Sequence, residues 1–128
     1  MEQDVILKAH VQVKRIYSLL AEVLDLSKQL TEALDRNDQV TVRMLVSMRR
    51  EPINKLRLAR AVLEEQKMEL PAEDGKRLAE LLNGESAREE AEQALAAQVQ
   101  MNRRLLQQVL ELDKTLSLKV AREKSFYQ

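Results

Sequence analysis

The segment from Ser86 to Gln128 has the pattern of one long amphipathic helix with an unusually wide apolar face. At 100° per residue, apolar side chains cover about half of its circumference, which is more than the seam of a two-stranded coiled coil requires. One edge of this arc is formed by Leu95, Val99, Leu106 and Leu110. The other edge is formed by Met101, Leu105 and Leu112, and the middle by Val109, Leu116 and Val120. Such a helix must be covered on two sides, by the rest of the chain or by another protein.

The composition favours a helical fold throughout. The chain has 128 residues, of which 2% are aromatic, with two glycines and two prolines. Leu, Ala, Glu, Gln, Lys and Arg dominate, and all of them favour helix. The length suits one domain with one core. We therefore expect a single all-α domain over residues 1-128, either an antiparallel helical bundle or an elongated helical hairpin, with three long helices and one short helix.

The charges are balanced, with 21 basic and 21 acidic residues, so the chain has no net field to attract nucleic acid or an anionic membrane. The balance favours protein partners. The absence of cysteine excludes thiolate chemistry. The first residues lack the features of a signal peptide, and no apolar run approaches the roughly 20 residues of a membrane span. We therefore expect a cytoplasmic protein without a membrane span.

The first long helix is expected over residues 3-36, because apolar residues recur there at alternating spacings of three and four. Asn37 can adopt a left-handed conformation and Asp38 can cap the next helix. So short a connection predicts an antiparallel hairpin. The second helix, over 38-69, contains Pro52, which removes one backbone hydrogen bond. We expect a kink near Pro52, or a short break between Arg49 and Glu51.

A short helix is expected over residues 73-82, and Asn83 and Gly84 form its predicted C-terminal stop. Ser86 followed by Glu89 has the spacing of a capping box, which predicts the start of the last helix. That helix is expected over 86-125.

Three polar residues, Gln98, Asn102 and Asp113, fall inside the apolar arc of the last helix. In a closed core, each would need a hydrogen-bond partner or would cost about 1–3 kcal/mol. One interpretation is that they specify the register of a packed bundle. The other is that this face is only partly covered and receives an incoming segment.

The sequence offers little support for catalysis. His10 is the single histidine, so no histidine-based triad or paired-histidine metal site can form. Glu89 and Glu92 have a spacing that could hold Mg²⁺ in a helical nucleotide hydrolase, but their surroundings are typical of a solvated helix surface. We expect no enzyme activity, no cofactor and no metal site.

Three stretches resemble a known family in their layout: the first is Leu30 to Asp38, the second is Met48 to Leu56, and the third is Gln100 to Leu110. The chain resembles the flagellar type III export chaperones of the FlgN and FliT kind. The resemblance implies a small helical protein that holds unassembled flagellar axial subunits in the cytoplasm. Its C-terminal helical region would bind the C-terminal helices of hook-associated and filament-cap subunits. Carried over by position, the cargo face would consist of Leu105, Leu106, Val109, Leu112, Leu116 and Val120.

The apolar face of the last helix is wider than a two-stranded coiled coil requires, and two explanations fit this width. The first is a non-catalytic binding module that recognises an amphipathic helix of a partner protein. The alternative is a self-associating structural or adaptor protein, a homodimer without a client.

Overall fold

The computed structural model describes residues 1–127, with side chains described as far as residue 122, and the regular structure of this part is entirely helical. The elements are α1 (Gln3–Asp35), α2 (Gln39–Met68), α3 (Ala72–Leu82), the single 3-10 turn η1 (Glu90–Glu92) and α4 (Gln93–Tyr127). Three helices are long and one is short, so the predicted all-α fold class is confirmed.

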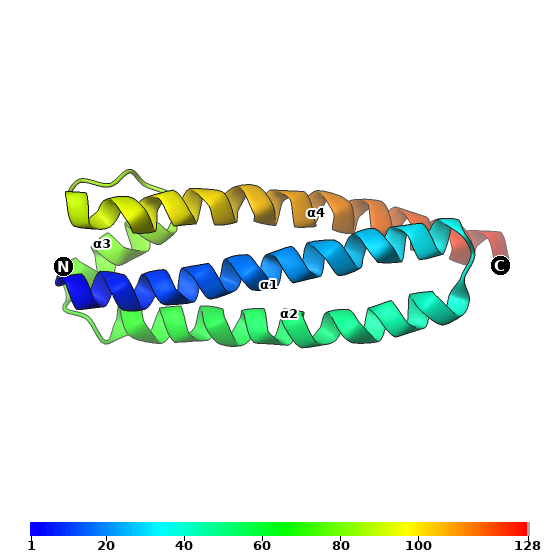
Figure 1. The fold of residues 1–128 in the computed structure, drawn as a ribbon, viewed down its shortest axis with the longest axis horizontal. Helices are drawn as coiled ribbons and strands as arrows, with labels where there is room; N and C mark the ends of the chain where they lie inside the picture. The colour runs from blue at the N-terminus through cyan, green and yellow to red at the C-terminus, as the bar shows by residue number, and fades with distance from the viewer. Residues whose placement is uncertain (128) are drawn as a thin grey trace.

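The long helices lie side by side, with α1 between α2 and α4 (Figure 1). The helices α1 and α2 form the expected antiparallel hairpin. Because α2 and α3 return the chain to the end at which it started, α4 runs in the same direction as α1. The central helix α1 therefore packs along both of the other long helices.

The turn between α1 and α2 forms as its residues predict. Asn37 has a left-handed backbone with φ of +57°. The Asp38 carboxylate accepts hydrogen bonds from the Thr41 backbone N–H at 3.1 Å and from the Thr41 hydroxyl at 2.6 Å. These bonds to the charged form lower the pKa of the Asp38 carboxyl. Local side-chain chemistry thus ends one helix and starts the next.

The helix α2 is continuous from Gln39 to Met68, so the break considered near Pro52 does not occur. Pro52 is buried in the bundle. On either side of it, Leu45 and Leu63 pack into core clusters built on α1. We attribute the continuity to this packing, which holds both halves of the helix against α1 despite the missing hydrogen bond.

The predicted start of the last helix is wrong. The chain stays non-helical past Ser86 and enters η1 only at Glu90, and α4 begins at Gln93. Ser86 and Glu89 form no capping box. The backbone carbonyl of Ser86 instead accepts a hydrogen bond from Arg77 at 3.0 Å, so a long-range contact overrides the local capping signal. The predicted stop of the short helix does form, with Asn83 as its C-cap and Gly84 at φ of +98°.

The core consists of three clusters along α1. At the α3 end, Leu78, Leu81 and Leu95 are fully buried. In the middle, Leu20 and Val23 of α1 pack with α4, and the far cluster joins α1 to both α2 and α4. Every cluster contains α1 side chains, which makes α1 the helix on which the others are assembled.

Replacing Leu81 with alanine should lower the free energy of unfolding by about 2–5 kcal/mol, because it leaves a cavity where α3 packs on α1 and α4. Replacing Leu7, which is 60% exposed on α1, is the matched control and should change it by less than about 0.5 kcal/mol. Urea unfolding followed by circular dichroism measures both. Equal decreases in the free energy of unfolding for the two substitutions would contradict the packing of α3 on α1 and α4.

Candidate helix-binding groove

A groove runs along one face of the molecule between α2 and α4. It opens in two depressions, each lined by all three long helices, and in each of them α1 side chains spaced by three or four residues form the floor. The floor residues are Val13, Ile16, Leu20, Leu30 and Leu34. Four of them are at most 6% exposed and Ile16 is half-buried, so the floor is largely covered, and the exposed apolar side chains of the groove belong to its walls.

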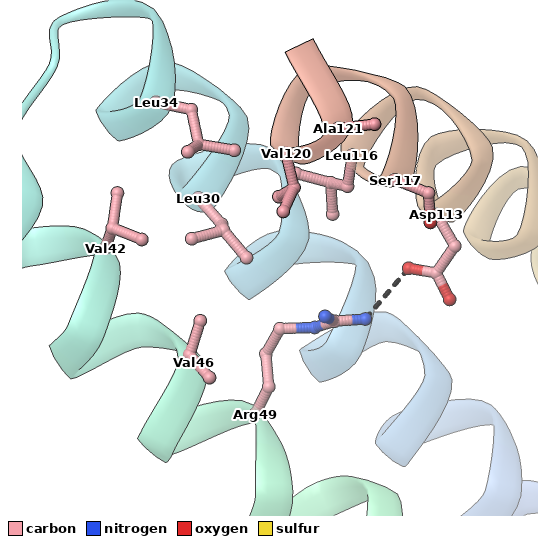
Figure 2. A pocket seen from close by; sticks show the side chains of 10 residues that line it. All are labelled: Leu30, Leu34, Val42, Val46, Arg49, Asp113, Leu116, Ser117, Val120 and Ala121. Atoms are coloured by element: carbon pink, nitrogen blue, oxygen red, sulfur yellow. Dashed lines mark hydrogen bonds and ion pairs between the residues drawn. The ribbon is translucent and has the colours of Figure 1, made fainter. Parts of the chain in front are cut away.

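The first depression has a volume of about 530 Å³ and lies at the end farther from α3 (Figure 2). Leu30 and Leu34 form its floor. Its walls come from α2 on one side and from α4 on the other, and they are lined by Val42, Val46, Arg49, Asp113, Leu116, Ser117, Val120 and Ala121. Apart from one ion pair and one serine, this lining is apolar.

The second depression, of about 410 Å³, lies nearer to α3. Leu56 and Arg60 line it from α2, and Val99 and Leu106 line it from α4. Leu82, the last residue of α3, closes one end. In both depressions the wall residues recur at spacings of three and four, as residues on one helix face do. The two depressions therefore follow one another along the same face of the molecule, with no lining residue in common.

The short helix α3 fills the groove at the remaining end. Leu78 and Leu81 are fully buried there, in a cluster with Ile6 and Val13 of α1 and Leu95 of α4. α3 thus occupies the position that the fourth helix of a four-helix bundle would take, over one end of α1 only. The rest of that position is open.

An ion pair crosses the open part of the groove. Arg49 of α2 donates a hydrogen bond from Nη2 to Asp113 Oδ1 of α4 at 2.8 Å (Figure 2). The Asp113 side chain is 42% exposed and that of Arg49 is 19% exposed. The Arg49 Nε–H is buried and has no hydrogen-bond acceptor in the described part of the chain. Arg49 therefore retains an unused donor at the groove.

Asn102 has a different role from Asp113. It is buried, its Nδ2 donates to the Val13 carbonyl oxygen of α1 at 2.7 Å, and its Oδ1 accepts from Gln98 at 3.0 Å. A buried amide bonded between two helices favours one register over the others. Of the two interpretations of the polar residues, register fits Asn102 and Gln98, whereas Asp113 lies in the open groove.

The six residues predicted as a cargo face fall into three groups. Leu105, Val109 and Leu116 are buried in core clusters with α1. Leu106 is 43% exposed and Val120 is 39% exposed, and both line the groove. Leu112 is half-buried. The arc of α4 is wide because Leu105, Val109 and Leu116 hold α4 on α1, while Leu106 and Val120 face the groove.

The sequence prediction did not include the parts of the groove from α1 and α2. Val42 and Val46 form its second wall, and Leu30 and Leu34 form its floor. The signal that could have identified the floor is the width of the apolar stripe on the first helix, because such a stripe indicates more than one neighbour. No local pattern in the second helix marks Val42 and Val46 as groove residues.

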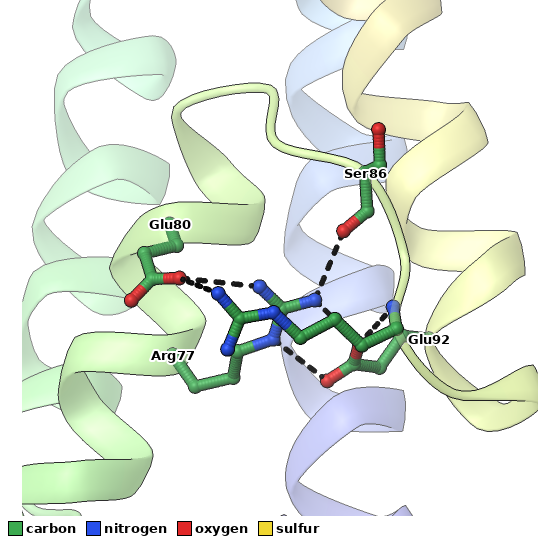
Figure 3. Close-up of polar contacts among 5 residues, drawn as sticks. Arg77, Glu80, Ser86 and Glu92 are labelled. Carbon is green, nitrogen blue, oxygen red and sulfur yellow. Dashed lines mark hydrogen bonds and ion pairs between the residues drawn. The ribbon is translucent and has the colours of Figure 1, made fainter.

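A network of polar contacts fixes the connection between α3 and α4 (Figure 3). Arg77 forms a two-pronged ion pair with Glu92, with Nη2–Oε1 at 2.6 Å and Nε–Oε2 at 3.0 Å. The Arg88 backbone N–H also donates to Glu92 Oε1, at 2.9 Å. Glu92 is 3% exposed, so its prediction as solvated helix surface is wrong. No local pattern indicates this pair, because its members lie 15 residues apart in the chain.

The Arg77 hydrogen bonds lower the pKa of the Glu92 carboxyl to about 2, against the opposing effect of burial. Glu92 is therefore ionised and held by Arg77 at neutral pH. Among the described residues, no group of three or more His, Cys, Asp or Glu side chains is placed to hold a metal ion. No helix within residues 1–127 is long and apolar enough to cross a membrane.

No match to this chain is found among protein-family models, curated proteins or solved structures. What the groove binds must therefore be inferred from its shape, its apolar lining and its charges.

The Arg77–Glu92 pair predicts a specific dependence of stability on pH. Because the pKa of Glu92 in the folded chain is about 2, below its ordinary value of 4.5, its contribution is complete above pH 4.5 and is lost as the pH falls toward 2. Glu92→Gln should lower the free energy of unfolding by about 3 kcal/mol at pH 7. At pH 3, the difference in unfolding free energy between this variant and the unaltered chain should be smaller than at pH 7 by about 2 kcal/mol.

Urea titrations at the two pH values measure this gap. Glu89→Gln is the control, because Glu89 is exposed and close in sequence, and it should leave the unfolding free energy unchanged at both pH values. A gap between Glu92→Gln and the unaltered chain that stays constant from pH 7 to pH 3 would rule out the proposed ionisation of Glu92.

Proposed function

We propose that the chain is a non-catalytic cytoplasmic export chaperone of the flagellar type III kind. In this proposal it holds an amphipathic C-terminal helix of a hook-associated or filament-cap subunit until export. The observation that carries the proposal is the open fourth-helix position, which has an apolar floor on α1 and walls on α2 and α4. The sequence resemblance described above supplies the class of client.

The shape of the groove suits a helix better than an extended strand or a small molecule. It follows the axes of three long helices, and α3 already packs in it as a helix. An amphipathic helix bound in such a groove inserts apolar residues at spacings of three and four, which match the spacing of the groove walls. A helix of the client would continue the bundle that α3 begins.

The energetics suit a reversible complex. Val46, Leu106 and Val120 are each about two-fifths exposed in the groove. Full burial of such a side chain contributes roughly 1.5–3 kcal/mol, so completing the burial of partly covered ones contributes less. After the entropic cost of association, an affinity in the micromolar range is expected. A chaperone must release its client, and moderate affinity permits this.

The cargo face of this proposal is narrower than the six residues named from the sequence. Leu106 and Val120 contact the client directly. Leu105, Val109 and Leu116 act indirectly, because their packing on α1 sets the distance between α4 and α2.

The double substitution Leu106→Asp and Val120→Asp should weaken binding of the C-terminal region of a hook-associated subunit by at least about tenfold, because it places two charges in the apolar groove. The matched control is Leu7→Asp with Leu118→Asp, two side chains that are 60% and 64% exposed and lie outside the groove. Isothermal titration measures binding, and circular dichroism verifies helix content. Equal affinities of the two variants would contradict the proposed client site.

The alternative of a homodimer without a client is supported by the same exposed apolar side chains, such as Leu110 at 56% exposure. The two explanations differ in the state of the free protein. In the chaperone proposal, the chain sediments as a monomer at low micromolar concentration, and Leu106 and Val120 are accessible. A stable dimer in which the groove is protected from hydrogen exchange would favour self-association instead.

A further inference from the structure

The chain is neutral as a whole, but its charges are not evenly distributed. The two helices that form the groove walls are both basic. In α2 there are seven basic residues, Arg43, Arg49, Arg50, Lys55, Arg57, Arg60 and Lys67, against three acidic ones, Glu51, Glu64 and Glu65. Through residue 122, α4 has five, Arg103, Arg104, Lys114, Lys119 and Arg122, against Glu111 and Asp113. The net charge of zero conceals this bias of the two helices. Of their charged residues, those that line the groove are Arg49, Arg60, Arg103, Glu64 and Asp113.

Several of these basic residues lie on the rim of the groove. Arg43, Arg50 and Arg57 are spaced by seven residues on α2, so they lie in one row along the helix. This row is next to the wall residues Val46 and Arg60 on the helix surface. All three arginines are exposed, and within residues 1–122 none of them forms an ion pair.

Inside the groove, Arg49 offers a second kind of contact. Its Nη2 is bonded to Asp113, while its buried Nε–H has no acceptor among the described residues. A buried N–H without an acceptor costs free energy comparable to that of a lost hydrogen bond. Because the chain itself covers this Nε atom, a carboxylate that enters the groove would reach only the exposed part of the Arg49 guanidinium, with which it would form a charge-assisted bond.

The chain's own α3 shows what kind of helix the groove accepts. It buries Leu78 and Leu81 against α1, and its first turn carries Glu73 and Asp74. Near its C-terminal end, Arg103 of the α4 wall donates to the Asn83 carbonyl oxygen at 2.7 Å. The helix seated in this groove is thus short and amphipathic and is held at its end by a basic residue of the wall. Its Asp74 lies 3.9 Å from the Met1 amino group rather than at a basic residue of α2 or α4.

We propose that the open groove beyond α3 binds one amphipathic helix of a partner protein whose polar flanks carry Asp and Glu. One of its carboxylates bonds to Arg49, and others face the row Arg43, Arg50 and Arg57. Together the two depressions span residues 103 to 121 of α4, a length of about 27 Å, which corresponds to a helix of about 18 residues. This inference rests on the proposed helix-binding function and adds the charge of the ligand and the place where it lies.

A second copy of the chain is a poor occupant of the same groove. Its α2 and α4 carry the same positive charge as the groove walls, and its α1 already packs against both of them. Like charges directly opposed at an interface disfavour association. The charge pattern therefore selects a partner with a different sequence.

Two designed 18-residue peptides test the charge preference. They share one apolar face of leucines spaced by three and four residues, and their flanking positions are Glu in one peptide and Lys in the other. Fluorescence anisotropy with the full chain should show that the Glu peptide binds at least about tenfold more tightly at low salt, and that raising the salt concentration reduces the difference. Equal affinities, or tighter binding of the Lys peptide, would overturn the proposal.

Charge reversal locates the binding site. The triple variant Arg43→Glu, Arg50→Glu and Arg57→Glu should lose the preference for the Glu peptide. The control Lys8→Glu, Arg15→Glu and Arg104→Glu changes the net charge equally, at exposed positions outside the groove, and should keep it. Because these side chains are exposed, both variants should keep their helix content. Loss of the preference in both variants to the same degree would show a general charge effect and overturn the proposed site.

The client experiment and the peptide experiment fail independently. If a flagellar subunit binds and the Arg43, Arg50 and Arg57 variant binds it equally well, the charge inference fails and the chaperone function stands. If the Glu peptide binds in the groove and no flagellar subunit binds, the flagellar assignment fails and the groove specificity stands.

Discussion

The structure depends on the burial of α1 between two neighbours. The apolar stripe of this helix is too wide for one partner, so α2 packs on one side of it and α4 on the other. Because α2 and α4 both pack on α1, they are held apart from each other along one face of the molecule. The groove is a direct consequence of that spacing, and α3 fills only the end at which the chain turns back.

Three polar contacts between segments fix this arrangement, and each has a different role. Asn102 bonds to the backbone of α1 and sets the register of α4. The Arg77–Glu92 pair holds the connection that seats α3. The Arg49–Asp113 pair spans the groove from wall to wall and leaves one donor of Arg49 without an acceptor in the described chain. The first two stabilise the fold, whereas the third lies where a ligand would bind.

Local signals predicted the parts of the fold that depend on neighbouring residues. Asn37 and Asp38 form the turn that their side chains favour, and helix periodicity was sufficient to predict the fold class. The start of α4 was mispredicted because Glu92 bonds to Arg77, a contact that no local pattern reveals. For the candidate site, periodicity identifies the apolar arc of α4 but not which edge the chain itself covers. Leu116 is therefore buried, whereas Val120, one turn later, lines the groove.

The central claim is that the open fourth-helix position is the binding surface. Chemical-shift mapping of the isotope-labelled chain, during titration with the Glu-flanked peptide, tests it most directly. The account predicts that the largest changes occur at the groove walls and floor, at Val46, Leu106, Val120 and Leu34. Changes centred instead on Met44, Leu58 and Val62, exposed apolar residues of α2 that do not line the groove, would contradict it.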